Sequence, residues 1–307
     1  MKHLFIINPV AGGKDQRLEI MGAASGALGA RGETDYAFYV TRGPMDAAEK
    51  IRAAAAEAAG AGTELRVYAC GGDGTLNECC NGAAGLPHVA VTQYPCGTGN
   101  DFIKQFGADK ALFSQIGLLL DGEVRPLDLI FCNGRYSVNI CSVGVDARIG
   151  TQVHRYSSLP LVGGATGYLV SVVVNLIRGI NQRLTIATDG ETPCTGDFAL
   201  ACVCNGTWYG GSFNPVPEAR PDDGLLDVLL VRGVSRLTFL RLVGEYAKGN
   251  YARYPRYIRH VRARTVTIAG EAPFVINLDG EALESNRAEM TVCPGALRFL
   301  FPAGLGK

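Results

Sequence analysis

The stretch that decides the fold is Cys70-Gly71-Gly72-Asp73-Gly74-Thr75-Leu76-Asn77-Glu78. It follows residues 65–69, a short run with strand character, and it leads into residues 76–84, which are expected to begin a helix. A strand, a tight glycine turn and a helix N-terminus in this order are typical of a phosphate site. The three glycines let the backbone come close to a polyphosphate and direct N–H groups at it. A plain β-turn is the alternative. Asp73 would repel phosphate unless it held a metal ion, another cation or a water.

The composition indicates a globular chain with no overall charge. Of its 307 residues 47% are hydrophobic and 19% are charged, and 29 basic side chains balance 29 acidic ones. We therefore expect one large or two moderate domains, with no global attraction to nucleic acid or to a membrane. The ten cysteines include no CxxC pair, which favours free thiols in a reducing cytosol, and the N-terminus does not resemble a signal peptide.

Alternating strand-like and helix-like segments over the first 125 residues predict a parallel sheet with helices on both faces. The predicted strands are residues 3–8, 35–40, 65–70 and 89–94, and the predicted helices are residues 14–30, 44–59 and the helix after the glycine turn. Loops that follow parallel strands gather at the carboxyl edge of the sheet, where open α/β sheets bind ligands.

The pattern changes near Arg125, where we expect a domain boundary. Residues 126–133 and 136–143 alternate in hydrophobicity and predict a hairpin around Asn133-Gly134. Strand-like runs then dominate, with one helix over residues 235–247 that has Ser235 as its N-cap. The second half is therefore predicted to be a mainly antiparallel β domain. The predicted strands are residues 183–187, 197–204, 225–231, 265–269, 274–278, 288–293 and 297–301.

One long uncharged run, residues 156–177, is interrupted by Pro160 and several glycines. These interruptions favour a buried helix from about residue 166 to 178 over a transmembrane segment.

Four loops carry polar residues on a glycine-containing backbone: residues 8–14, the glycine turn, residues 95–101 and residues 277–281. The sequence has no GxxxxGK[ST] motif and no GxGxxG after a strand, which weighs against a P-loop and a dinucleotide fold. GxSxG and HExxH are also absent, which weighs against hydrolases and zincins.

The ordered set of motifs resembles the catalytic domain of diacylglycerol and sphingosine kinases, and most of all the bacterial soluble lipid kinase branch. The resemblance rests on Asn8-Pro9 with Gly12, on Gly71-Gly72-Asp73-Gly74-Thr75 and on Pro95 with Gly97-Thr98-Gly99-Asn100-Asp101. In the second half it rests on Asn205 with Gly210-Gly211, on Pro217-Glu218-Ala219, on Asp222-Asp223-Gly224-Leu225-Leu226-Asp227 and on Leu278-Asp279-Gly280-Glu281. The glycine motif alone is shared with NAD kinases and phosphofructokinases.

The resemblance implies an N-terminal α/β nucleotide domain and a C-terminal β-rich domain of residues 126–293, with the active site in the cleft between them. Residues beyond about 293 are expected to return to the first domain. It also implies transfer of the γ-phosphoryl group of ATP, with Mg²⁺, to the hydroxyl of diacylglycerol or a related lipid alcohol.

The resemblance implies which residues contact the nucleotide: Asn8, Thr41, Gly71, Gly72, Asp73, Gly74, Thr75, Leu76, Asn77 and Thr98. Asp101 and Asp128 match acidic members of a charged network that includes Lys14. Such a network suits phosphoryl transfer, which depends on positioning and charge neutralisation. For Asp128 the alternative is a strand-end carboxylate with a backbone partner.

Glu281 matches the family's proton acceptor, and Asp73 is expected to face the phosphates and orient the metal or the base. Asp279 could be the base in place of Glu281. Glu281 could also be a carboxylate of a solvent-exposed turn, without a catalytic role. The family's Mg²⁺ site corresponds to the Asp223 side chain with the main-chain oxygens of Arg220 and Leu225, which are ligands that a hard cation accepts. A plain Asp-Gly turn is the alternative for Asp223.

Two other functions stay open at this point: another kinase of the superfamily, such as NAD kinase, and a non-enzymatic nucleotide- or lipid-binding regulator. Residues 251–264 contain five arginines and three tyrosines without an acidic residue. A solvated surface connection before a strand is one interpretation, and docking on anionic lipid is the other. No motif supports nucleic-acid binding. Part of residues 159–177 either lines the acyl-chain site or belongs to the plain core, and the sequence leaves both open. We expect a cytoplasmic protein that touches the inner membrane face, with a homodimer left open.

Overall fold

A computed structural model of the chain describes residues 1–148 and 179–306. The predicted helix over residues 166–178 and the predicted lipid-lining run lie outside the described residues. The chain forms two compact units, Met1–Leu129 joined by the chain from Pro294, and Ile130–Cys293. The boundaries expected from the sequence were near residues 125 and 293.

The first unit is built on a parallel sheet, as predicted. The strand order is β2-β1-β3-β4, and the end of the chain adds β13 beside β4, also in parallel. The strands are β1 (Lys2–Ile7), β2 (Tyr36–Val40), β3 (Leu65–Gly71) and β4 (Val89–Pro95). β1 and β3 are almost wholly buried, because strands covered on both faces need continuous apolar runs.

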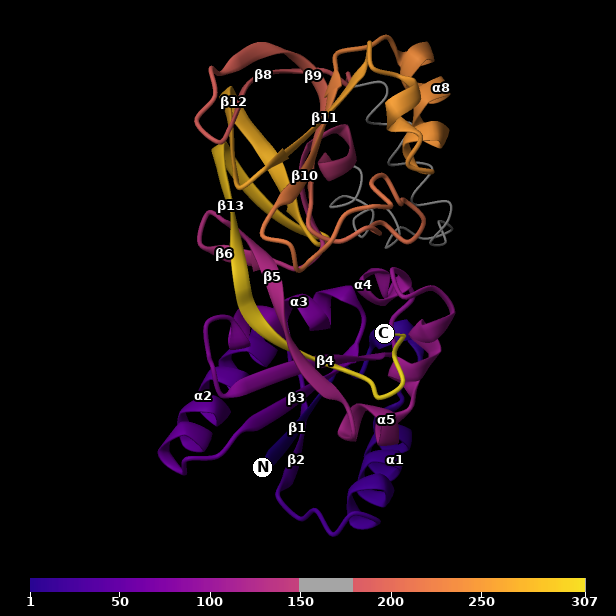
Figure 1. Cartoon of the computed structure of the whole chain (residues 1–307), viewed down its shortest axis with the longest axis vertical. Coiled ribbons are helices and arrows are strands. Elements are labelled where there is room, and N and C mark those ends of the chain that lie inside the picture. The colour runs from indigo at the N-terminus through magenta and orange to yellow at the C-terminus, as the bar shows by residue number, and fades with distance from the viewer. Residues whose placement is uncertain (149–178, 307) are drawn as a thin grey trace. The chain divides into compact units, whose positions relative to one another are not determined.

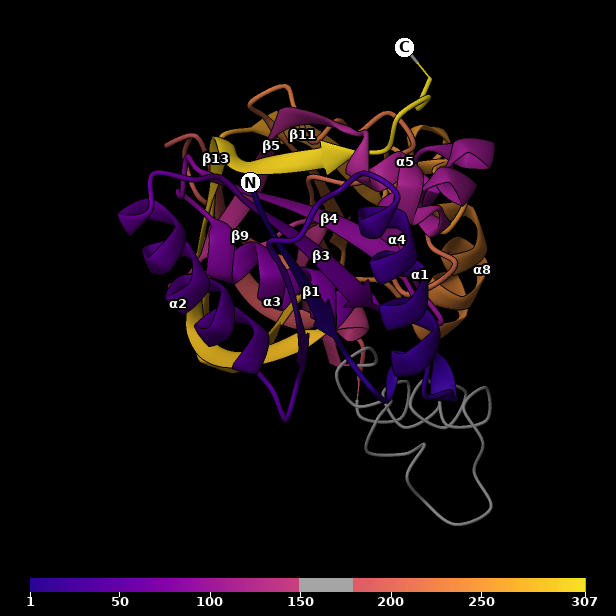
Figure 2. The same ribbon diagram turned by 90° about the horizontal axis from the view of Figure 1, so that it is seen from below.

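Helices cover both faces of this sheet: α1 and α5 lie on one face, and α2 and α3 on the other (Figures 1 and 2). Their bounds are α1 (Arg17–Gly29), α2 (Asp46–Gly60), α3 (Asp73–Ala83), α4 (Asp101–Lys104) and α5 (Ile116–Leu120), with short 3₁₀ turns η1 (Ala11–Gly13) and η2 (Gly107–Ser114). The alanine face of α2 lets α3 approach closely, and a Cβ on Gly82 of α3 would lie 2.9 Å from the Cα of Ala48.

Two helix starts differ from the prediction. α1 begins at Arg17 rather than at Lys14, because Lys14 is extended, with φ −132° and ψ 138°, and the Asp15 side chain accepts the Arg17 N–H at 3.1 Å. α3 begins at Asp73 rather than at Leu76, so the glycine turn itself supplies the first residues of the helix.

The second unit is a set of antiparallel strands, as predicted. Its elements are β6 (Arg135–Ser137), β7 (Ile140–Gly144), β8 (Gln182–Thr188), β9 (Cys194–Cys204), β10 (Leu226–Arg232), α8 (Arg236–Tyr246), η3 (Tyr251–Arg253), β11 (Ile258–Ala263) and β12 (Thr265–Leu278). Side chains of β10 alternate between two apolar cores: Val228 packs among strands, whereas Leu229 packs on the side that holds Leu242 of α8. All ten cysteines are free, as expected.

Two predictions of local structure in this unit are confirmed. Asn133 and Gly134 have φ values of 46° and 88° and connect β5 (Glu123–Cys132) to β6, which is the hairpin turn expected from an Asn-Gly pair. Ser235 caps α8, because its hydroxyl accepts the Thr238 N–H at 3.2 Å.

Other predictions of local structure were wrong. Residues 136–143 are not one strand. β6 ends at Ser137, and β7 is a separate strand that pairs with β9 and β12. β11 was not expected at all. β12 and β13 (Glu281–Phe301) are each one long strand where two were predicted, and β12 has a register irregularity between Ala269 and Phe274.

β13 belongs to both units. Its first part pairs with β12, and Arg298 and Phe299 pair with β4. Asp128 of β5 is buried, and it accepts the Gly295 N–H at 2.8 Å, which helps to hold the strand where it enters the first unit. The sequence left open that Asp128 is a strand-end carboxylate with a backbone partner, and this hydrogen bond is such a partner.

Candidate functional site

Three of the predicted loops meet at the carboxyl edge of the parallel sheet. They follow β1, β3 and β4, which are neighbours in the sheet. The Asn8 N–H donates to the Cys70 carbonyl at 3.0 Å, and the Cys96 N–H donates to the Gly71 carbonyl at 3.0 Å. The Asn8 side-chain amide also donates to the Thr75 hydroxyl at 3.2 Å. The three loops therefore form one continuous surface of backbone.

Glycine is required here by contact between the loops. A Cβ on Gly71 would overlap the Thr75 side chain, and a Cβ on Gly97 would overlap the Cα of Gly72. A Cβ on Gly12, whose φ is 65°, would overlap the Cys96 carbonyl oxygen. Side chains at these positions would push the loops apart and fill the surface that the sequence predicts for phosphate.

The N-terminus of α3 opens onto this surface. Gly72 is its N-cap and has no side chain that could cap the helix. The first N–H groups of a helix lack intrahelical partners and carry partial positive charge. Gly74 is exposed at this end, whereas Leu76 and Asn77 are buried within α3. An anion such as a phosphate fits the uncapped N–H groups.

Asp73 links two of the loops. One of its carboxylate oxygens accepts the Asp101 N–H, the first N–H of α4, at 2.5 Å. A Cβ on Gly99 would overlap its other oxygen. Asp73 was expected to face the phosphates. In the structure this carboxylate has a hydrogen-bond partner in the loop that follows β4. Its position therefore fixes that loop against the start of α3.

The end of β2 lies at the same edge. The Thr41 N–H donates to the Ile7 carbonyl at 2.9 Å, which places Thr41 beside the loop that follows β1. The next turn is held by Arg42 and Asp46, 3.0 Å apart. Hydrogen bonds from the Arg42 side chain and backbone lower the pKa of Asp46 to about 2. Thr98, the other predicted threonine contact, is exposed.

The charged residues expected to form a network are only partly brought together. Asp101 pairs with Lys104 at 2.6 Å, and both side chains are largely buried. Lys14 is exposed and pairs with no acidic group of the described residues. Lys104 was not predicted, although its i,i+3 spacing from Asp101 on α4 was a signal that could have found it.

In the second unit the turn between β12 and β13 carries Asp279 and Glu281. Asp279 and Gly280 have positive φ values of 52° and 104°. The Asp279 carboxylate accepts three backbone N–H groups, those of Val138 at 2.6 Å, Asn139 at 3.0 Å and Ile140 at 2.9 Å. It therefore joins this turn to the segment between β6 and β7. Glu281 is exposed.

Residues 2–132 match the family model described as "Diacylglycerol kinase catalytic domain", and residues 139–301 match "YegS C-terminal NAD kinase beta sandwich-like domain". The chain belongs to the YegS-like lipid kinase family. The expected family is therefore confirmed on both halves of the chain.

Curated relatives named "Probable lipid kinase YegS-like" support this assignment. The protein from Pseudomonas aeruginosa (strain UCBPP-PA14) is 28% identical over 89% of this chain and 96% of its own length. The protein from Shewanella frigidimarina is 28% identical over 77% of this chain and 76% of its own length. A solved structure titled a diacylglycerol kinase from Bacillus anthracis str. Sterne has 23% identity and a TM-score of 0.70 over 99% of this chain and 98% of its own. A second structure from that organism has the same identity and coverage, with a TM-score of 0.77. These structures show the fold.

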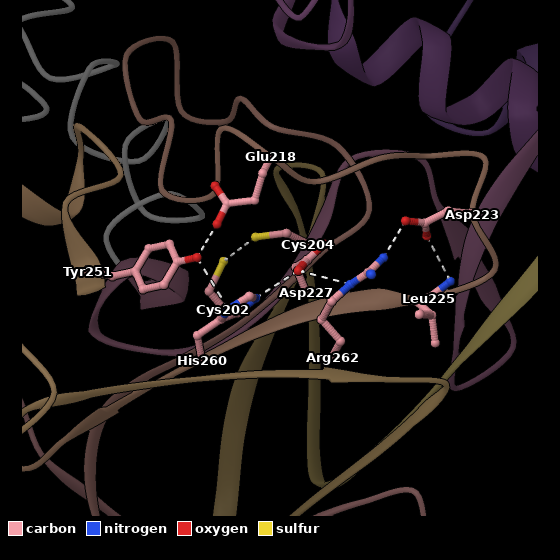
Figure 3. Close-up of polar contacts among 9 residues, drawn as sticks. All are labelled: Cys202, Cys204, Glu218, Asp223, Leu225, Asp227, Tyr251, His260 and Arg262. Carbon is pink, nitrogen blue, oxygen red and sulfur yellow. Dashed lines mark hydrogen bonds and ion pairs between the residues drawn. The ribbon is translucent and has the colours of Figure 1, made fainter.

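The residues predicted to hold a structural Mg²⁺ in this lipid kinase do not fit a divalent ion as the structure arranges them. One Asp223 oxygen accepts a hydrogen bond from Arg262, and the other accepts the Leu225 N–H at 3.1 Å (Figure 3). The Arg220 side chain, a second cation, lies 3.3 Å from Asp222. The geometry of Asp223-Gly224 is that of an Asp-Gly turn, with a Gly224 φ of 73°.

A further polar cluster in the second unit had no sequence signal. Asp146 follows β7, and one of its oxygens accepts the Tyr209 hydroxyl at 3.2 Å. The hydroxyls of Tyr209 and Tyr246 lie 3.1 Å apart. Burial raises the pKa of the Asp146 carboxyl to about 6, against the opposing effect of its hydrogen bonds. Its residues come from segments far apart in the chain, so the spacing of residues along the sequence could not reveal the cluster.

The loop contacts generate a prediction about nucleotide binding. Gly97→Ala should separate the loops after β3 and β4, because the added methyl group overlaps the Cα of Gly72. We expect ATP affinity measured by calorimetry to fall at least about tenfold, which corresponds to ~1.4 kcal/mol. Gly22→Ala on α1 is the control, since nothing lies within 4 Å of its new Cβ, and it should bind ATP as the wild type does. Equal ATP affinity for Gly97→Ala would show that the nucleotide binds elsewhere.

Proposed function

We propose that the protein transfers the γ-phosphoryl group of ATP to the hydroxyl of diacylglycerol or a related lipid alcohol. The observation that carries the proposal is the uncapped N-terminus of α3, placed among three interlocked glycine loops in a chain of the lipid kinase family. In this proposal the N–H groups of α3 bind the nucleotide phosphates, and the loop after β4 completes the cradle. Mg²⁺ arrives with ATP and neutralises part of the phosphate charge.

Proton removal is assigned to Glu281. A lipid hydroxyl holds its proton tightly at neutral pH, so a base must take the proton as the new O–P bond forms. Glu281 is exposed at the start of β13, whereas the oxygens of Asp279 are occupied by three N–H groups. The chemistry requires Glu281 to reach the acceptor hydroxyl while the first unit holds ATP.

A phosphorylation assay with a panel of acceptors tests the proposed function. We expect ATP consumption with diacylglycerol or another lipid alcohol in detergent micelles, and none above background with NAD. The rival activity is NAD phosphorylation, because the family model that matches residues 139–301 is described as like the β sandwich of NAD kinase. Consumption of ATP with NAD but with no lipid would replace the proposal by that rival. Binding of ATP without turnover on any acceptor would favour a regulator.

Substitutions at the β12–β13 turn test the assignment of the base. Glu281→Gln should lower kcat by about 10²–10⁴-fold while ATP affinity and melting temperature stay near the wild-type values. Asp279→Asn should instead lower the melting temperature by several degrees, because three hydrogen bonds to a charged acceptor are weakened, each worth about 1.5–3 kcal/mol at most. Near-full kcat in Glu281→Gln together with an inactive but stable Asp279→Asn would move the base to Asp279.

We propose that the protein acts at a membrane surface, because the proposed acceptor is a lipid. Among residues 1–148 and 179–306 there is no helix of the length and apolarity that crossing a bilayer needs. Within the predicted basic stretch, Arg259 lies 3.6 Å from Glu191 and Arg262 is held by Asp223, so these two charges are engaged. Arg253 and Arg256 remain exposed.

The preceding helix adds an apolar component to this surface. Leu237 and Leu240 of α8 are 60% and 51% exposed, and they are spaced i,i+3 on one side of the helix. Arg236 and Arg241 are exposed on the same helix. Exposed leucines flanked by arginines are the composition of a helix that lies in the interface of an anionic bilayer. We therefore assign docking to α8 together with Arg253 and Arg256.

Vesicle sedimentation tests this assignment. Binding should require anionic lipid and should weaken with salt, and Leu237→Glu with Leu240→Glu should reduce it by about tenfold or more. Leu18→Glu is the control, because Leu18 of α1 is 86% exposed but belongs to the first unit. Substituting Arg241, Arg253 and Arg256 should also weaken binding, since each basic residue adds about 1 kcal/mol near such a surface. Binding that ignores lipid charge and these substitutions would refute the assignment.

A further inference from the structure

The loop over residues 220–225 enters β10 and carries the carboxylate that the family resemblance assigns to a metal. In this chain Asp223 is already bound to a cation of the protein itself. Its Oδ2 accepts a charge-assisted hydrogen bond from the Arg262 guanidinium, and its Oδ1 accepts the Leu225 N–H at 3.1 Å. Figure 3 shows the Arg262 side chain extending toward Asp223.

The pairing of two strands places the arginine. β10 and β11 are antiparallel, and their register sets Arg262 directly opposite Asp227. The Arg262 Nε lies 3.6 Å from the Asp227 Oδ1, and Asp227 is only 2% exposed. One guanidinium therefore lies between a buried strand carboxylate and a loop carboxylate. Its position depends on the sheet, which makes it a permanent neighbour of the loop.

The other carboxylates around this loop already have partners within the protein. Asp222 has Arg220 as its partner at 3.3 Å, and Asp227 also contacts His260, with Nε2 and Oδ1 2.7 Å apart. His260 in turn meets the Tyr251 hydroxyl at 3.2 Å, and that hydroxyl donates to Glu218. A divalent ion at Asp223 would have to displace one guanidinium and approach a second, which Coulomb repulsion opposes.

We propose that the Arg262 guanidinium is the resident cation of this loop and replaces the divalent ion that the family resemblance implies. It joins the 220–225 loop to β10 and β11 through Asp223 and Asp227, which is the cross-link that a bound ion would otherwise supply. The chain then has no metal requirement at this loop, whereas Mg²⁺ still accompanies ATP in the proposed reaction. This inference does not depend on which acceptor the kinase uses.

Thermal unfolding without nucleotide tests the proposal, so that Mg²⁺ bound to ATP cannot contribute. The wild type should melt at the same temperature in EDTA and in saturating Mg²⁺, because a ligand shifts stability only if the folded state binds it. Arg262→Gln should lower the melting temperature in EDTA by about 3–6 °C. Mg²⁺ should restore part of that loss, since the vacated carboxylates can then hold the ion.

Three further variants make the outcome specific. Arg259→Gln is the matched control, because Arg259 lies on the same strand and its ion pair among the described residues is with the exposed Glu191. It should neither destabilise the protein nor create a response to Mg²⁺. Asp223→Asn combined with Arg262→Gln should abolish the response to Mg²⁺. Arg262→Lys keeps the charge and should retain most of the stability, so a glutamine variant that fails to fold does not block the test.

A wild-type melting temperature that rises with Mg²⁺, and stops rising in Asp223→Asn, would overturn the proposal in favour of a metal at this loop. An Arg262→Gln variant as stable as the wild type would also overturn it. A loss of stability that Mg²⁺ does not restore would refute the idea that the arginine stands in the place of an ion.

Discussion

The close approach of Gly97 to Gly72 is the constraint on which the loop edge of the first unit depends. The loops after β3 and β4 touch through backbone atoms, and the loop after β1 is held to them through Asn8 and Thr75. Because no side chain separates the loops, the first turn of α3 stays open at the sheet edge. Asp73 holds the loop after β4 in place, because its carboxylate accepts the first N–H of α4. Packing between the loops and an open phosphate surface therefore have the same cause.

The turn between β12 and β13 places its two acidic residues in different environments. Asp279 is committed to three backbone N–H groups of the β6–β7 segment, which fixes the turn. Glu281, two residues later, begins β13 with its side chain exposed. Carboxylates two positions apart thus receive different environments from the backbone. A fixed turn and an exposed carboxylate are what the proposed role of Glu281 as a base requires.

Local chemistry in the sequence predicted those features whose causes are local. The glycine turn, the Asn133-Gly134 hairpin and the Ser235 cap each depend on residues a few positions apart, and the structure contains all three. β11 was missed because its arginines at 259 and 262 suggested a basic surface segment, although Ile258 and Ala263 are buried. The pairing of Asp223 with Arg262 could not be foreseen, because it depends on the register of β10 against β11. The same holds for Asp279, whose partners lie about 140 residues earlier in the chain.

The central claim is that ATP phosphates bind the backbone N–H groups of the glycine loops. The most direct test is an amide NMR titration of protein with isotopically labelled glycine, adding Mg²⁺ and a non-hydrolysable ATP analogue. The account predicts shifts at Gly71, Gly72, Gly74 and Gly97, with no shift at Gly22 of α1 or at Gly134 in the β5–β6 turn. Saturating binding that leaves the loop glycines unmoved would contradict it.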